Sequence, residues 1–386
     1  MRFNRWPAAS EAEGRFVMLA GTVLGLVGAL LFGLGLLLDP RQAYLSYLTA
    51  YLTGLSLVWG ALSMLMISHL TGAAWFGGFR RAAEVIAATT PVFALLFLPL
   101  VAGMHLLYPW VPPLAGLDAA TRESIAARSA WLNVPFFLVR AALYFAVWIG
   151  VSLLLRRWSL ERERRPGAAP VTRSRALSAG ALPAVALTLT FAAFDWMMSL
   201  SPDWYSTIYG VYVFAGGFIA ALGLLAATAS SAPRSGLLER EASPDSYRSL
   251  GNLLLAFVIF WVYLGFSQLL IIWIANIPTE VAWYVPRVHG SWAMLGLLLL
   301  AGNFAVPFLL LLFLRFKCSP RAMAGLGLWL LAMHYLDIYW LLVPQLYPAG
   351  VHVSWLDLAT LAGVSGVALT YGAWQLRRHS LVRAVE

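Results

Sequence analysis

Residues 194–217 read FDWMMSLSPDWYSTIYGVYVFAGG, and they lie where two long apolar runs meet. One run arrives from Arg175 and the other continues to Ala229, so the sequence predicts two hydrophobic helices joined by a tight turn at residues 201–203. Asp195 then lies about four or five residues inside the first helix, hence roughly 7 Å from its end. A carboxyl at that depth in a bilayer is costly, so we expect it to face a bundle interior or a polar cavity.

The whole chain shares this apolar character. Of its 386 residues, 61% are hydrophobic and 11% are charged, a composition far from that of soluble domains. The apolar runs are unbroken, whereas the strands of a membrane barrel would alternate polar and apolar residues. The sequence therefore predicts an all-α, polytopic membrane protein that forms one membrane domain over residues 1–386. We expect ten spans, at about 16–38, 43–68, 82–108, 132–155, 175–200, 205–229, 249–275, 290–315, 321–343 and 354–376.

The net charge of +9 is distributed by side of the membrane. Most Lys and Arg residues lie at the two termini and in the loops after spans 2, 4, 6 and 8. This asymmetry follows the positive-inside rule, so we expect both termini in the cytoplasm and no nucleic-acid partner. The lone cysteine, Cys318, allows no disulfide within the chain and cannot supply the four thiolates of an iron–sulfur cluster.

Spans 3 and 4 carry three ionisable residues. Glu84 and His105 fall on the same seven-residue repeat as Pro91 and Leu98, so we expect them on one side of a single helix. Glu84, at the cytoplasmic end, either pairs with a neighbouring arginine or is the point where protons enter a path. Arg140 lies about eight residues inside span 4, where a guanidinium requires an acid or carbonyl partner, in a structural ion pair or in a substrate site.

The second half of the chain carries a further group. His334 and Asp337 are three residues apart and share one side of span 9. Glu280, Arg287 and His289 stand in the loop between spans 7 and 8, on a side whose loops otherwise carry little charge. We interpret these five residues as functional candidates, against the alternative of internally paired structural groups.

The candidates map to the outer half of the membrane, so helices that bring them together would form one polar pocket. Such a pocket fits proton release or the binding of a quinone headgroup, with His and Asp accepting protons from a quinol. A bis-histidine haem would require His105 to face His334, and we expect neither haem nor a metal site in this chain. The residues expected to converge are Asp195, His105, Arg140, Glu280, His289, His334 and Asp337.

Three segments resemble a known family. They are residues 194–216, residues 276–292 (NIPTEVAWYVPRVHGSW) and residues 333–344 (MHYLDIYWLLVP). Together they are similar to the ActF-type membrane subunit of bacterial alternative complex III, a relative of the NrfD and polysulfide-reductase membrane subunits. The likeness is sharpest over residues 190–345. One departure is Asp203, where the family pattern leads us to expect a histidine.

The resemblance implies two four-helix bundles, spans 2–5 (about 43–200) and spans 6–9 (about 205–343), with spans 1 and 10 peripheral. It implies a subunit of a quinol:electron-acceptor oxidoreductase, without redox centres of its own, that contributes proton transfer and a candidate quinone site. The implied partners are an NrfD-like sister subunit, an iron–sulfur protein and a multihaem cytochrome c. Within the matching motifs stand Asp195, Glu280, His289, His334 and Asp337.

Two other functions remain open from the sequence. An independent secondary transporter would place charged and interrupted helices near the bilayer midplane, whereas these residues lie nearer one face. A purely structural anchor subunit would hold the same ions in internal pairs.

Overall fold

The computed structural model describes residues 8–114, 116–164, 168–235 and 242–385, and every regular element in these ranges is a helix. The all-α, multi-pass prediction is therefore confirmed for this part of the chain. Ten segments are long and apolar enough to cross a membrane: Gly14–Leu38, Pro40–Thr71, Ala74–Ala102, Val134–Arg162, Ala169–Leu200, Tyr209–Ser230, Pro244–Ala275, Gly290–Leu312, Pro320–Gln345 and Trp355–Leu376.

Several crossing segments consist of more than one helix. The elements of the crossing segments are α1 (Ala8–Leu38), α2 (Pro40–Thr71), η1 (Ala74–Phe76), α3 (Gly77–Ala87), α4 (Thr90–Leu96), α5 (Leu98–Ala102), α8 (Val134–Arg164), α9 (Ala168–Trp196), η2 (Met198–Leu200), α10 (Tyr209–Ser235), α11 (Pro244–Ala275), α13 (Gly290–Leu299), η4 (Leu300–Ala305), α14 (Val306–Leu312), α16 (Pro320–Leu342), η5 (Val343–Gln345) and α17 (Trp355–Val385). The connecting helices are α6 (Met104–Leu107), α7 (Ala119–Ala127), α12 (Pro278–Tyr284), η3 (Val285–Val288) and α15 (Leu314–Lys317).

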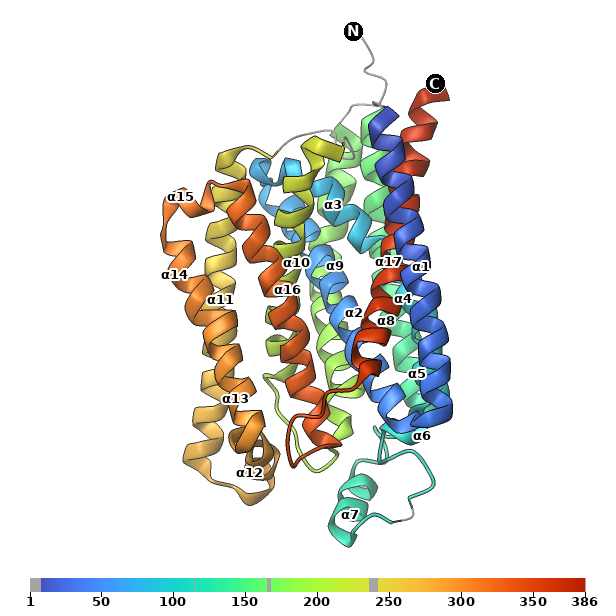
Figure 1. The fold of residues 1–386 in the computed structure, drawn as a ribbon, viewed down its shortest axis with the longest axis vertical. Coiled ribbons are helices and arrows are strands. Elements are labelled where there is room, and N and C mark those ends of the chain that lie inside the picture. The colour runs from blue at the N-terminus through green and yellow to red at the C-terminus, as the bar shows by residue number, and fades with distance from the viewer. Residues whose placement is uncertain (1–7, 115, 165–167, 236–241, 386) are drawn as a thin grey trace.

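Helices α2, α10 and α16 run through the centre of the molecule (Figure 1). Helices α1 and α17 pack along each other at one edge, and α11, α13 and α14 form the opposite edge. Helix α1 begins and α17 ends at the same end of the molecule, while α7 and α12 lie at the other end (Figure 1). The start of α1 and the end of α17 lie together because an even number of crossings returns the chain to the side on which it began.

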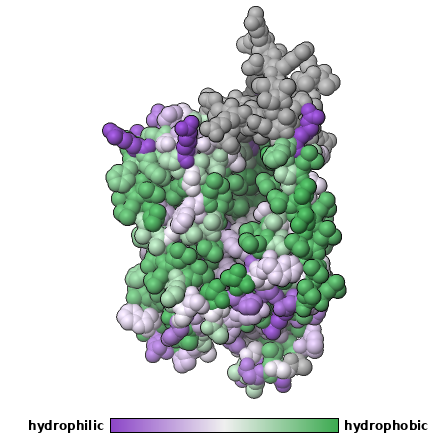
Figure 2. All heavy atoms as spheres, viewed as in Figure 1, coloured by the Kyte–Doolittle hydropathy of each residue, from purple (hydrophilic) through white to green (hydrophobic). Residues whose placement is uncertain are grey.

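The sides of the molecule are apolar. Figure 2 shows hydrophobic residues over most of the visible face, with hydrophilic residues gathered toward the two ends. Leu30 on α1 is 75% exposed and Trp273 on α11 is 74% exposed. A protein with large apolar side chains exposed over whole helices would aggregate in water, whereas such side chains are stable in contact with lipid. The surface therefore supports a membrane location.

Span 3 is not the single helix that the seven-residue repeat predicts. It divides into α3, α4, α5 and α6, with Pro91 in the first turn of α4 and Pro99 in the first turn of α5. Proline lacks the N–H of the helical ladder and clashes with the preceding turn, so each one begins a new helical segment. The predicted common side is consequently lost: Glu84 is buried, whereas Leu98 and His105 are exposed.

Span 8 contains a π-helical stretch, η4, which the sequence did not predict. The indole N–H of Trp329 on α16 donates a hydrogen bond of 2.8 Å to the Gly302 carbonyl within it. A π-helical turn leaves backbone groups out of the regular ladder, and this indole satisfies one of them.

Close packing of α10 against α2 places the second half of the chain beside the first. A Cβ atom at Gly217 on α10 would lie 2.7 Å from the Cβ and the carbonyl oxygen of Ser56 on α2. Real Cβ atoms do not approach so closely, so the glycine permits this contact, as small residues do between membrane helices.

The turn after α9 is longer than predicted. Helix α9 ends at Trp196, so Asp195 lies in its last turn, and the one-turn 3₁₀ helix η2 follows. Helix α10 begins at Tyr209 rather than near 205, which leaves Tyr205 in the connection with 57% of its surface exposed. The connection at the end of α9 therefore lies within reach of the loop that precedes α8.

Candidate functional site

Asp195 receives four hydrogen bonds inside the first half of the chain. Arg140 on α8 donates through Nε to Oδ2 and through Nη2 to Oδ1, each at 2.8 Å. The Tyr144 hydroxyl donates to Oδ2 at 2.8 Å, and the Trp131 indole donates to Oδ1 at 2.8 Å. The carboxylate is 1% exposed. Its charge and both of its oxygens are thus fully matched by groups of this chain.

Arg140 is equally well held. Its Nη1 donates to the Trp131 carbonyl at 3.1 Å, and its guanidinium lies 4.1 Å from the Trp131 ring centre and 4.3 Å from the Phe136 ring centre. Two-point pairing with Asp195 is the strong geometry for an arginine and a carboxylate. Of the two alternatives for Arg140, the contacts therefore favour a structural ion pair.

Asp337, in the second half of the chain, receives only neutral donors. The Tyr212 hydroxyl on α10 donates to Oδ1 at 2.7 Å, and the Trp261 indole on α11 donates to Oδ2 at 3.1 Å. The side chain is 1% exposed, and no ion pair involves it among the described residues. Burying a carboxylate without a cation has a high free-energy cost. Asp337 therefore differs from Asp195, whose charge is paired with that of Arg140.

His334, one turn before Asp337 on α16, contacts the first half of the chain. Its Nε2 lies 2.7 Å from the hydroxyl oxygen of Ser56 on α2, and that hydroxyl donates its only hydrogen to the Thr53 carbonyl at 2.9 Å. With the Ser56 hydrogen on the Thr53 carbonyl, Nε2 carries a hydrogen of its own and donates to Ser56. Nδ1 is buried without a hydrogen-bond partner, and in this tautomer it carries a free lone pair.

The open nitrogen of His334 and the carboxyl of Asp337 border the same point on α10. A Cβ atom at Gly216 would lie 3.1 Å from His334 Nδ1 and 3.2 Å from Asp337 Oδ2. The two groups do not form an ion pair. An imidazole nitrogen and a carboxyl that can carry a proton thus both border Gly216, which has no side chain.

Arg287 is buried at the C-terminal end of α16. It is 2% exposed, and it donates to the carbonyls of Trp283 at 2.6 Å and Leu341 at 2.8 Å. Leu341 belongs to the last turn of α16, whose unpaired carbonyls attract a cation. Burial lowers the pKa of Arg287 to about 9, and its guanidinium lies 3.4 Å from the Trp283 ring centre. Arg287 therefore anchors the η3 loop to α16.

The other predicted outer-pocket residues lie apart from both acids. His105 on α6 and His289 are exposed, and Glu280 on α12 is half-buried with no side-chain hydrogen bond among the described residues. His289 Nδ1 lies 2.7 Å from the Val285 carbonyl of its own loop.

Glu84 lies toward the opposite end of the molecule. Its Oε1 accepts from the Ser159 hydroxyl at 2.5 Å, and its Oε2 lies 3.5 Å from Arg81 Nη1. The pairing with a neighbouring arginine, one of the two alternatives, is therefore present.

The expectation of one shared pocket needs correction. The described contacts divide the predicted residues into an Asp195 group, made with Arg140, and an Asp337 group, made with His334. Helix α2 packs between them, with Trp59 stacked on Trp196 at 6.4 Å between ring centres. The sequence identified these ionisable residues, but the direction of each side chain depends on the packing of the helices.

Sequence reasoning overlooked a signal that relates the two groups. Asp195 and Pro202 are separated by the same number of residues as Asp337 and Pro344, and a 3₁₀ turn follows the main helix in both places. Each acid also receives one tyrosine hydroxyl and one indole. The partners that the sequence did not identify are Ser56, Trp131 and Trp261.

No group of three or more His, Cys, Asp or Glu side chains that could hold a metal ion occurs in the described ranges. A comparison with known proteins finds no family model that matches this chain and no characterised protein with a significant sequence match.

Proposed function

We propose that this chain is a membrane subunit of a bacterial quinol-oxidising respiratory complex of the alternative complex III type, and that His334 and Asp337 transfer protons in it. The resemblance of residues 190–345 to ActF-type subunits supports the class. The charge asymmetry supports cytoplasmic termini, with the α7 end of the molecule facing outward. The proposed partners are an NrfD-like sister subunit, an iron–sulfur protein and a multihaem cytochrome c, which would hold the redox centres.

One observation carries the proton-transfer proposal. His334 Nδ1 is buried without a hydrogen-bond partner, and it borders the same point on α10 as the carboxyl of Asp337, which no cation of the described residues neutralises. Proton transfer requires an acceptor and a donor at hydrogen-bond distance or one water molecule apart. Gly216 places no side chain at the point that both groups border.

His334 and Asp337 can relay one proton between them. A proton that arrives on Asp337 is taken up at Nδ1, which leaves a carboxylate beside an imidazolium, and its return to Asp337 restores the starting state. Nε2 keeps its contact with Ser56 on α2 throughout.

A structural role is the better proposal for Asp195 and Arg140. Their hydrogen bonds are complete and Trp131 covers them, so neither residue offers a free site to a proton or a quinone. The anchor function thus applies to the first half of the chain, and proton transfer to the second.

The test uses the complex purified from its native membrane. We expect Asp337→Asn and His334→Ala to lower quinol-coupled proton movement in proteoliposomes about a hundredfold, a typical loss for a proton-transfer group. Asp245→Asn, an exposed acid in the first turn of α11, is the matched control. Subunit composition is checked by mass spectrometry.

Two results would contradict the proposal. Wild-type proton movement in a fully assembled Asp337→Asn complex would remove the role of the His334–Asp337 pair. Isolation of the native protein without multihaem cytochrome and iron–sulfur partners would remove the respiratory class, and an independent transporter would then be the better explanation.

A further inference from the structure

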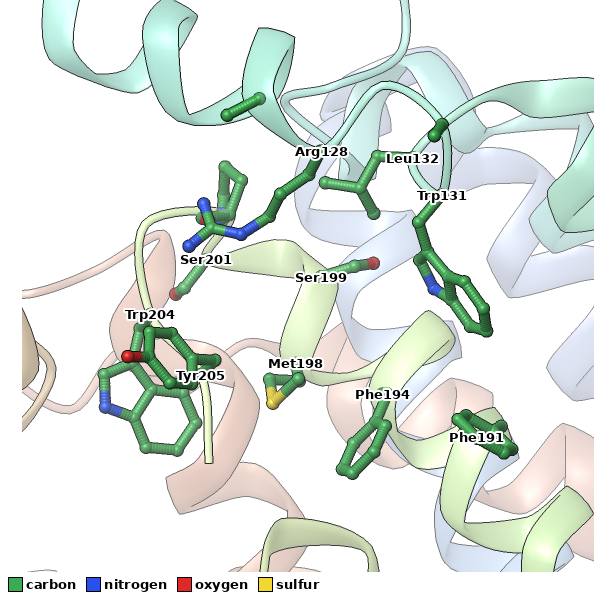
Figure 3. Close-up of a pocket in the computed structure, with 13 residues that line it drawn as sticks. Arg128, Trp131, Leu132, Phe191, Phe194, Met198, Ser199, Ser201, Trp204 and Tyr205 are labelled. Atoms are coloured by element: carbon green, nitrogen blue, oxygen red, sulfur yellow. The ribbon is translucent and has the colours of Figure 1, made fainter. Parts of the chain in front are cut away.

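A pocket of about 360 Å³ lies at the outer ends of α8 and α9, and we name it the Trp131 pocket. Its wall includes the Trp131 ring, and Phe191, Phe194 and Met198 line it from α9 and η2 (Figure 3). Arg128 and Tyr205 line its other side (Figure 3). Its volume falls in the range of small-molecule sites.

The Trp131 pocket is apolar where it borders a membrane-crossing segment and polar where it borders the connecting loops. Phe191, Phe194 and Met198 belong to the crossing segment Ala169–Leu200. Arg128 and Tyr205 lie in connections outside the crossing segments. An occupant would therefore place its apolar part in the membrane and its polar part at the surface, which is the arrangement of a membrane amphiphile.

The surface end of the Trp131 pocket is cationic. Arg128 Nη1 donates to the Pro202 carbonyl at 2.5 Å, and the guanidinium lies 5.9 Å from the Tyr205 ring centre. No ion pair involves Arg128 among the described residues. The neighbouring acid Asp203 accepts from Thr121 at 3.0 Å instead. The positive charge of Arg128 is thus available to an anion.

The Trp131 pocket is separate from the Asp195 group. The indole N–H of Trp131 points to Asp195 Oδ1, while the ring of the same residue forms a wall of the pocket. An occupant would touch the apolar ring and leave the buried ion pair undisturbed. The pocket therefore lacks a base that could take protons from a quinol, and its single charged group suits an anionic headgroup.

We propose that the Trp131 pocket binds one anionic phospholipid from the leaflet at the α7 end of the molecule. The phosphate lies at Arg128, and the upper part of one acyl chain packs against Phe191, Phe194 and Met198. This site goes beyond the proton-transfer function and does not depend on it. A lipid bound here would hold the loop before α8 against the connection between α9 and α10.

Native mass spectrometry of the detergent-purified protein, titrated with dioleoyl phosphatidylglycerol, tests the site. We expect one tight lipid adduct, and we expect Arg128→Gln to weaken it about fivefold, the effect of one basic residue at a membrane surface. Arg122→Gln, an exposed arginine on α7 that does not line the pocket, should leave the affinity unchanged. Dioleoyl phosphatidylethanolamine should bind more weakly than phosphatidylglycerol.

A second measurement covers the case in which Arg128→Gln disturbs the loop. Brominated phosphatidylglycerol quenches tryptophan fluorescence on contact, so the first equivalent should quench the wild-type protein. Trp131→Phe should remove part of that quenching, whereas Trp273→Phe on the lipid-facing side of α11 should remove none. Equal effects of the two tryptophan variants, or of the two arginine variants, would overturn the proposal. Displacement of the lipid by inorganic phosphate or by a short-chain quinone would also overturn it.

Discussion

Asp195 and Asp337 stand at corresponding places in the two halves of the chain, yet only Asp195 is paired with an arginine. Each carboxyl lies the same distance in sequence before a proline, and each receives a tyrosine hydroxyl and an indole N–H. Arg140 adds two charged hydrogen bonds to Asp195, while Asp337 has His334 nearby with a free nitrogen. The same local motif thus holds an ion pair with arginine in one half and, in the other, a carboxyl with only neutral donors beside a histidine.

The ion pair of Arg140 with Asp195 predicts that mutations of the two residues have large, non-additive effects on the free energy of unfolding. We expect Arg140→Gln to destabilise the protein by about 3–5 kcal/mol, because it leaves the Asp195 charge buried without a partner. The double variant Arg140→Gln with Asp195→Asn should lose less than the two single variants together, since it removes both charges. Denaturant titration in detergent gives these values. Additive losses would show that the two residues are not energetically coupled.

The contact between Ser56 and His334 predicts the tautomer of the imidazole. In the wild-type protein we expect the hydrogen on Nε2, with the Ser56 hydroxyl donating to the Thr53 carbonyl. Nitrogen-15 NMR of protein labelled at histidine distinguishes the two tautomers. Ser56→Ala removes the acceptor and should shift the ring toward the other tautomer, whereas Ser56→Thr should preserve it. A wild-type ring with its hydrogen on Nδ1 would contradict the proton relay.

Gly216→Ala places a methyl group against the proton-carrying groups. The new Cβ would lie 3.1 Å from His334 Nδ1 and 3.2 Å from Asp337 Oδ2, closer than ordinary contact, so both side chains would have to shift. We expect proton movement to fall about tenfold or more, with assembly retained. Gly150→Ala on α8 is the control, because nothing lies within 4 Å of its Cβ position. Equal rates in the two variants would show that Gly216 has no role in the relay.

The hydrogen bond in the first turn of α7 predicts that low pH destabilises this turn. The Thr121 backbone N–H donates to Asp118 Oδ1 at 2.8 Å, and this hydrogen bond lowers the pKa of Asp118. A carboxyl with a lowered pKa stabilises the folded state above its unfolded pKa of about 3.9, and the stabilisation is lost as the pH falls through the folded value. Hydrogen exchange at Thr121 should therefore lose protection below about pH 4. Asp118→Asn should abolish that pH dependence, and an unchanged dependence would exclude Asp118 as its source.

The sequence by itself determined the class of fold and identified the important ionisable residues. Unbroken apolar runs can be stable only as helices in lipid, so the ten crossings follow from composition and length. The stop signal at Asn276 is likewise local: the residue ends α11 with φ of 48°, and Pro278 opens the next helix. The charge of Asp195, His334 and Asp337 marked them as buried groups that needed an explanation.

Only the tertiary structure decided which of these groups meet. Ser56 reaches His334 across 278 positions of sequence because α10 packs closely on α2 at Gly217, and no periodicity within one span encodes that contact. The break of span 3 at Pro91 turned His105 away from the side that carries Glu84. Hydropathy is a property of each helix alone, whereas the pairing of buried charges depends on how helices are rotated against their neighbours, which packing sets.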